Sequence, residues 1–249
     1  MSGHSQGATI KHKKGKEDAK RGKLFSKLSR AITVAAREGG ADPTMNVALA
    51  NAVEKAKSYS MPKDNIERAV QRGAGGAGGD AFEAIVYEGY GPAGVAIIVE
   101  VLTDNRNRSA AEVRNIFSKH GGSLAQPGAV AWMFERRGSV VVDGTKYAED
   151  DVMAAAIEAG ADDVVQDGDQ FEVLTQPADL GAVRDAIEAA GIAIEQAELT
   201  MVPKNTVQLE ENDARKTMKI MDALEDSDDV QEVYANFDIP EEILEALAG

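Results

Sequence analysis

The feature of this sequence that most constrains its fold is the glycine-rich stretch at residues 73–80, GAGGAGGD. Before it, apolar residues recur at the spacing of amphipathic helices; after it, runs typical of β-strands alternate with helical patterns. The stretch contains a G-x-G-x-x-G pattern, but it follows a helical segment rather than a strand, which excludes a dinucleotide site of the usual kind. It therefore predicts a flexible linker between a helical part and a larger α/β part.

The two parts carry opposite charge. The whole chain has a formal net charge of -15, yet residues 1–72 hold 15 Lys and Arg against 7 Asp and Glu. The first 30 residues alone hold nine basic residues against two acidic ones. This concentration predicts a polyanion-binding surface, most simply for the phosphates of a nucleic acid, although a basic tail without a fixed partner is the alternative. The acidic α/β part should face away from phosphates or meet a basic protein.

The N-terminal part predicts a basic arm followed by a three-helix bundle. Residues 1–15 lack apolar periodicity and are expected to order only on a ligand. From Glu17 to Glu38, apolar residues fill one sector of a helix and basic residues fill the opposite sector. A second helix is expected to begin at Asp42-Pro43 and to place Met45 in its buried stripe. A third helix is expected to begin at Pro62.

Basic residues of the arm and of the first and third helices are the candidate nucleic-acid contacts. The bundle could act as a helix-turn-helix, whose last helix reads the major groove, but purely structural bundles share this arrangement. Two more arginines lie in the motif LTDNRNRS, near a helix predicted to start with a capping box at Ser109. Pairing with nearby aspartates explains these two arginines equally well. The full candidate set is Lys11, His12, Lys13, Lys14, Lys16, Lys20, Arg21, Lys23, Lys27, Arg30, Arg68, Arg72, Arg106 and Arg108.

The α/β part predicts two domains, one inserted into the other. Residues 139–201 show the order strand, helix, strand, strand, helix, strand, which is that of a ferredoxin-like split βαβ fold. The segments on either side of them, including a strand at AVAWMFERR, complete a second domain only if they come together. The predicted fold is α+β: an N-terminal three-helix bundle followed by two ferredoxin-like α/β domains, one inserted into the other. The predicted boundaries are 1–78 for the arm and bundle, 79–137 plus 205–249 for the discontinuous domain, and 138–204 for the inserted domain.

Composition argues against several classes of protein. No apolar run approaches the roughly 18 residues that span a bilayer, and the N-terminus lacks the pattern of a secretory signal, so we expect a cytoplasmic protein without membrane contact. The absence of cysteine excludes disulfides, thiolate nucleophiles and cysteine-based zinc sites. Three histidines without cysteine do not form a usual zinc site, and no nucleophile, base and orienting group occur as a set. We expect no cofactor, no metal and no enzymatic activity.

Several motifs occur in a fixed order along the chain: IKHKK, RGKLFSKL, GGADP, YEGYGPAGVA, LTDNRNR and FSKHGG. Together they resemble the YebC/PmpR family, whose relatives include bacterial proteins described as transcriptional regulators and a mitochondrial activator of translation. The resemblance implies three domains, a cytosolic location and nucleic-acid-linked or ribosome-linked regulation without catalysis. Gly7 stands where the family usually has an aromatic residue, so any stacking contact of that ring would be lost here.

The leading hypothesis is a regulator of gene expression that binds nucleic acid through its basic N-terminal part. Promoter DNA and ribosomal RNA are both compatible with the sequence. The bacterial relatives favour DNA and the mitochondrial relative favours RNA and the ribosome. The alternative of a different class is a protein-interaction scaffold, whose basic arm binds acidic proteins.

Overall fold

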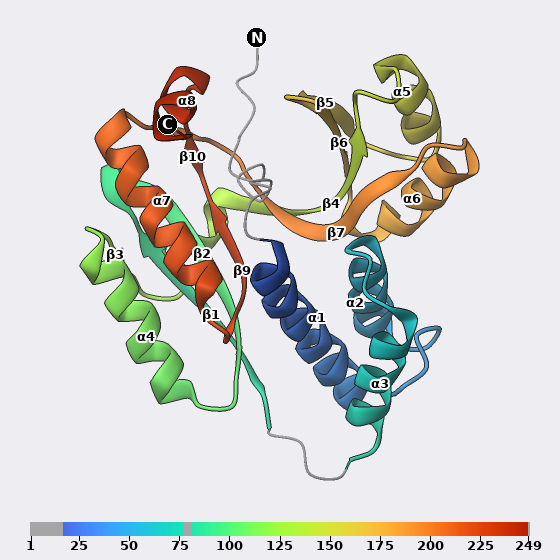
Figure 1. Cartoon of the computed structure of the whole chain (residues 1–249), viewed down its shortest axis with the longest axis horizontal. Helices are drawn as coiled ribbons and strands as arrows, with labels where there is room; N and C mark the ends of the chain where they lie inside the picture. Colours follow the sequence, from blue (N-terminus) through green and yellow to red (C-terminus); the bar gives the residue numbers. More distant parts are fainter. Residues whose placement is uncertain (1–16, 77–80, 249) are drawn as a thin grey trace. The chain divides into compact units, whose positions relative to one another are not determined.

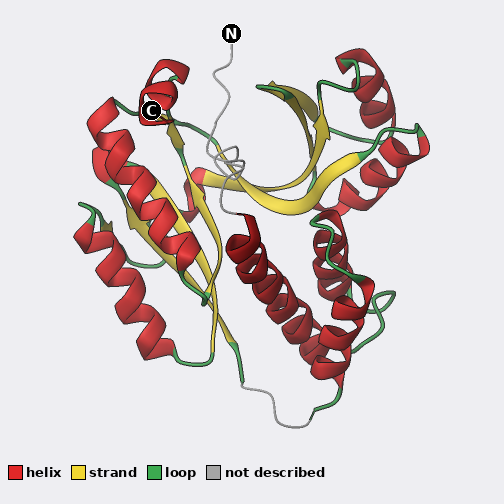
Figure 2. Cartoon of the chain, in the orientation of Figure 1, coloured by secondary structure: helices red, strands yellow, loops and turns green. Residues whose placement is uncertain are grey.

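The computed structural model of the chain describes residues 17–76 and 81–248 (Figure 1). Helices and strands alternate through most of its length (Figure 2). Contacts divide the described chain into two compact units: unit 1 holds residues 81–135 and 202–248, and unit 2 holds residues 17–76 and 136–201. The predicted α+β fold, with N-terminal helices followed by sheets, is confirmed.

Three helices form the first part of unit 2: α1 (Glu17–Gly39), α2 (Val47–Ser58) and α3 (Lys63–Ala74). Their buried side chains, among them Ile32, Leu49 and Ile66, form one hydrophobic core, as the apolar periodicity predicts. Gly73 lies against the backbone of Thr33, and a side chain at this position would force α3 away from α1. Helix α3 ends at Ala74, so the first two residues of the glycine-rich stretch, which the sequence predicts as a linker throughout, are helical.

The start of α2 differs from the prediction. Asp42 and Pro43 form a turn rather than a helix start, and the Asp42 carboxylate accepts hydrogen bonds from the backbone N–H and the hydroxyl two residues further on, at 2.9 and 2.7 Å. The helix begins only at Val47, with Asn46 as its N-cap. Because a turn places Met45 away from the helix, this side chain is 83% exposed and the predicted burial of Met45 was wrong.

The second part of unit 2 is a four-stranded sheet in the order β5-β6-β4-β7, with two helices. The chain order and strand order together are those of a ferredoxin-like fold. Buried residues such as Val140, Val173 and Ile187 form its core. The elements are β4 (Phe134–Asp143), α5 (Glu149–Glu158), β5 (Asp163–Asp167), β6 (Gln170–Thr175), α6 (Leu180–Ala189) and β7 (Ile194–Pro203).

Unit 1 is built on a four-stranded antiparallel sheet in the order β3-β1-β2-β9, which joins segments far apart in the sequence. Buried residues of the sheet and of α4 and α7, including Ile97, Phe117 and Leu224, share one core. Two short strands, β8 and β10, pair in parallel. The elements are β1 (Glu83–Tyr90), β2 (Ala96–Thr103), α4 (Arg106–Lys119), β3 (Ser123–Leu124), β8 (Val207–Gln208), α7 (Glu211–Asp226), β9 (Val230–Ala235), β10 (Phe237–Asp238) and α8 (Glu241–Ala248).

A buried carboxylate organises the loop between β3 and β4. Glu88 on β1 is 6% exposed and accepts backbone N–H groups from Gly128 at 2.5 Å, Val130 at 2.9 Å and Ala131 at 2.7 Å. These bonds hold the loop in an irregular path that ends in a short 3-10 turn, Ala131–Met133. The strand predicted at AVAWMFERR is therefore wrong in its first half. The second half of the predicted strand is the start of β4, which spans Phe134–Asp143. The domain boundary predicted after residue 137 therefore falls inside a strand.

The environment of Glu88 also affects its protonation. Burial alone would raise the pKa of this carboxyl, but the three backbone N–H donors favour its charged form and hold the pKa below the ordinary value. A lowered folded-state pKa means that ionised Glu88 stabilises the fold above the pKa of the unfolded chain. This stabilisation is lost as the pH falls through the lower folded-state pKa.

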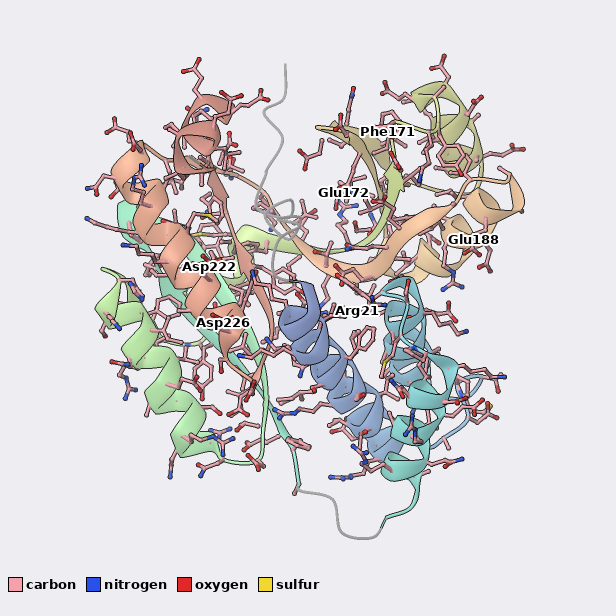
Figure 3. The ribbon with its side chains drawn as sticks, viewed as in Figure 1. Arg21, Phe171, Glu172, Glu188, Asp222 and Asp226 are labelled. Atoms are coloured by element: carbon pink, nitrogen blue, oxygen red, sulfur yellow. The ribbon has the colours of Figure 1, made fainter. Side chains whose placement is uncertain are left out.

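We predict that Glu88→Gln lowers the free energy of unfolding at neutral pH by about 1–3 kcal/mol, because the amide places an N–H₂ group against N–H donors. Urea unfolding measures the difference from wild type, which should shrink as the pH falls below 4.5, the ordinary pKa of the group. Glu188→Gln, on the exposed side of α6 (Figure 3), is the matched control. An effect of Glu88→Gln that is equally large in acid would contradict the charged-carboxylate explanation.

Candidate nucleic-acid interface

Helix α1 presents the predicted basic face. Its 23 residues contain no proline, and Leu28 and Ile32 are buried in the bundle at 4% and 0% exposure. Since the helix is held by this apolar side, the opposite side is fixed in orientation and concentrates positive charge over three turns. The basic residues placed there are Lys20, Lys23, Lys27 and Arg30, of which the first two are exposed and the last two half-buried.

Arg21 is an exception among the basic residues of α1, because it lies over an aromatic side chain. Its guanidinium carbon is 5.3 Å from the centroid of the Phe25 ring, one turn further along α1. This is the geometry of a cation–π contact. Figure 3 shows Arg21 near the start of the helix. The side chain covers part of the aromatic ring while its charge stays at the protein surface, next to the basic face.

Helix α3 adds a second group of basic residues. Ile66 and Ala69 are buried against the bundle, which leaves Arg68 and Arg72 exposed. The Arg68 Nη2 donates to the Asn65 Oδ1 at 2.6 Å, and its Nε donates to a backbone carbonyl at 3.1 Å, so this guanidinium is held in one position on the helix. Lys63 lies 3.6 Å from the Glu67 carboxylate, a weak exposed pair.

The remaining basic residues of the arm, Lys11, His12, Lys13, Lys14 and Lys16, lie outside the described residues, as does Gly7. Their contribution to binding stays a prediction from the sequence.

Helix α4 begins four residues earlier than predicted. Its N-cap is Asn105, whose side-chain oxygen accepts the backbone N–H of Arg108 at 3.0 Å. Ser109, the predicted cap, is instead buried in the first turn, and its hydroxyl donates to the Asp229 carboxylate at 2.7 Å. The prediction was wrong because a residue 120 positions away occupies the serine hydroxyl.

The two arginines at this helix start are paired with carboxylates. Arg106 Nη2 lies 2.6 Å from Glu83 Oε1, and their hydrogen bond raises the pKa of Arg106 and lowers that of Glu83. Arg108 Nη2 lies 2.8 Å from Asp229 Oδ2 and 2.7 Å from Asp104 Oδ1, and these bonds raise its pKa further. Binding of phosphate by Arg106 and Arg108 stays a prediction, and a ligand would have to share them with these acids.

The loop before α2 is a feature that the sequence prediction missed. Asn46 is 6% exposed, whereas its two neighbours, Met45 and Val47, are 83% and 74% exposed. A polar residue is buried there, and two apolar residues lie in solvent. The only signal in the sequence is the residue type, because asparagine is a frequent N-cap and Asn46 stands directly before the helix.

In residues 17–76 and 81–248, no group of three or more His, Asp or Glu is placed to hold a metal ion. No helix within the same ranges has the length and apolarity needed to cross a membrane.

The chain is similar over its length to known proteins. Residues 5–76 match the family model of the TACO1/YebC protein N-terminal domain, and residues 82–237 match that of the TACO1/YebC second and third domain. A "Probable transcriptional regulatory protein" of Rubrobacter xylanophilus is 60% identical and covers 100% of both chains. One of the same name from Halothermothrix orenii is 55% identical over 99% of both. The crystal structure of a conserved hypothetical protein, Aq1575 from Aquifex aeolicus, is 50% identical, with a TM-score of 0.85 over 94% of this chain and 97% of that one.

We predict that Ser109→Ala lowers the free energy of unfolding by about 1–3 kcal/mol, because it removes a donor from a buried carboxylate. Asp229 is 5% exposed and has no solvent to replace the lost hydroxyl. Ser118→Ala, on the exposed side of the same helix, is the control and should leave the stability unchanged. Equal stability of the two variants in chemical denaturation would show that the network around Asp229 is not structural.

Proposed function

Because the chain belongs to the TACO1/YebC family, we propose that it is a cytoplasmic, non-enzymatic regulator of transcription that binds DNA through its basic N-terminal part. The observation that carries the proposal is the basic face of α1, fixed by the buried residues on the opposite side of the same helix. Lysine and arginine side chains on such a face bind phosphates of any sequence. The family names support regulation of transcription as the biological role.

Binding would start at the arm and α1 and extend to α3. The arm holds four of the chain's lysines within six residues, 11–16, and follows the DNA backbone by charge. Arg68 and Arg72 on α3 provide further phosphate contacts, or base contacts if this helix enters the major groove. Arg106 and Arg108 would share a phosphate with the carboxylates of Glu83 and Asp229, to which they are already paired.

The rest of the chain repels DNA. Residues 73–249 hold 12 basic residues against 35 acidic ones. At this charge the α/β parts contribute no phosphate contacts of their own and are suited to a basic protein partner. This division assigns nucleic-acid affinity to the bundle and recruitment to the other domains.

We predict that replacing six lysines with glutamine abolishes DNA binding and leaves the fold intact, because about six phosphate contacts are lost. For wild type and duplex DNA, the logarithm of the binding constant should fall linearly with the logarithm of the salt concentration, with a slope near -5. Filter binding measures the affinity, and circular dichroism checks the fold. The replaced lysines are Lys11, Lys13, Lys14, Lys20, Lys23 and Lys27.

The control for this experiment replaces five lysines outside the bundle, all exposed. This variant should bind DNA with nearly the affinity of wild type, because these lysines contact no phosphate and salt screens their distant charge. The result that contradicts the proposal is retained affinity in the six-lysine variant. Tighter binding of ribosomal RNA than of any duplex would move the function to the ribosome, and a salt-independent affinity would favour a protein scaffold. The control lysines are Lys119, Lys146, Lys204, Lys216 and Lys219.

A separate prediction concerns sequence specificity. We expect Arg68→Ala and Gln71→Ala to change the affinity for a selected duplex and for random DNA by the same factor, because the basic residues of the arm and α1 contact phosphates. Competition binding with the two DNAs measures the ratio. A loss of about 1–3 kcal/mol for the selected duplex alone would show instead that α3 reads bases.

A further inference from the structure

Hydrogen bonds of two polar side chains, Asn46 and Asp42, hold the loop between α1 and α2. The Asn46 Nδ2 donates to the carbonyl oxygens of Ala35 at 2.8 Å and Gly40 at 2.9 Å, while its Oδ1 accepts the N–H of Leu49 at 3.1 Å. Gly40 has a φ of +92°, a conformation that glycine adopts without strain and that ends α1. Asp42 closes the turn that follows. One buried asparagine thus fastens the loop to both helices.

This loop holds two apolar side chains in solvent. Met45 and Val47, on either side of Asn46, are the most exposed of the large hydrophobic residues in the described part of the chain. Single exposed apolar residues are common and need no explanation. Met45 and Val47 differ from such single residues. They lie close together next to a buried polar side chain that holds the loop, and neither of them contributes to a core.

The loop lies at the same end of α1 as the last turns of α3. Ala35 accepts a hydrogen bond from Asn46, and the neighbouring Ala36 lies against Gly73 of α3. One turn of α1 therefore positions both the loop and the α3 residues that follow Arg68, including Arg72. In Figure 1 the loop projects at the right of the bundle.

The charge of the bundle favours a nucleic acid as the partner of the loop. The bundle to which the loop belongs, residues 17–76, holds eleven basic residues against seven acidic ones, so it attracts polyanions. Methionine and valine carry no strong donor or acceptor and cannot bind phosphate. In a nucleic acid, such side chains contact base faces, thymine methyl groups or the opening between unstacked bases.

We propose that Met45 and Val47 make a non-electrostatic contact with the bases of bound DNA, next to phosphates held by Arg72. This inference rests on the proposed DNA binding and extends it from the backbone to the bases. The arm and α1 supply salt-dependent affinity, and the loop supplies the part that salt does not weaken. Because the loop is already ordered, no free energy of binding is spent on fixing it.

The test compares the full-length double variant Met45→Ala/Val47→Ala with wild type on a fluorescein-labelled duplex DNA over a range of salt concentrations. We expect an unchanged salt slope and an affinity, extrapolated to 1 M salt, that is lower by roughly tenfold, the scale of burying part of two aliphatic side chains. A duplex with 2-aminopurine should gain fluorescence with wild-type protein and not with the variant, since the wedge disturbs base stacking.

The matched control is Met153→Ala/Ile157→Ala, which removes a similar exposed pair from α5 and should bind as wild type. A second variant, Met45→Gln/Val47→Thr, keeps the side-chain size, and equal melting temperatures show that all variants are folded.

If wild type binds DNA and the double variants have the same extrapolated affinity, the inference is overturned while the proposed function stands. The inference is also overturned if the double variants show a reduced salt slope on DNA, or if they lose affinity for ribosomal RNA alone. Absence of DNA binding by wild type defeats the proposed function itself.

Discussion

The structure of unit 1 depends on one buried carboxylate, that of Asp229. It accepts hydrogen bonds from Ser109 at 2.7 Å and from Arg108 at 2.8 Å, and its backbone oxygen accepts the N–H of Leu102 at 2.9 Å. These partners belong to the first half of unit 1, whereas Asp229 belongs to the second half, and 66 residues of unit 2 stand between the halves in the sequence. An unpaired buried charge is costly, so the fully bonded arrangement favours the joined halves over alternatives. Together with the pairing of β2 with β9, this contact joins the two halves on either side of the inserted residues.

The same network explains how charge is divided in the molecule. The motif LTDNRNR holds two arginines, and in isolation it could serve an anionic ligand as well as any part of the bundle. Asp229 and Glu83 engage both of them, so the cations of unit 1 neutralise acids within the protein. In α1, by contrast, buried apolar residues such as Leu28 and Ile32 hold the helix in the bundle, and the basic face lies on the other side of the helix. That face is the surface that we propose for a polyanion.

The sequence predicts the elements whose stability comes from apolar periodicity and misses those set by distant polar contacts. Helix α1, predicted from Glu17 to Glu38, spans Glu17–Gly39, and α3 begins one residue after the predicted start at Pro62. The errors at Ser109 and at AVAWMFERR arise from Asp229 and Glu88, carboxylates that bond groups 120 and about 40 residues away. In the candidate site, the spacing of basic residues along the sequence predicts the basic face of α1, but no spacing predicts that Met45 is exposed. Its position is decided by the Asn46 side chain, whose bonds to α1 no local pattern encodes.

The arm and the loop would contribute to binding in physically different ways. A lysine that is fixed on a phosphate loses side-chain conformational entropy of up to about 2 kcal/mol, and its attraction is screened within about 8–10 Å at ordinary salt. Such contacts capture any polyanion quickly but distinguish little between sequences. The loop around Asn46 is ordered before binding, and its apolar side chains gain only where bases can be reached. Any preference for deformable or thymine-rich DNA would therefore originate at the loop, even though the arm supplies most of the affinity.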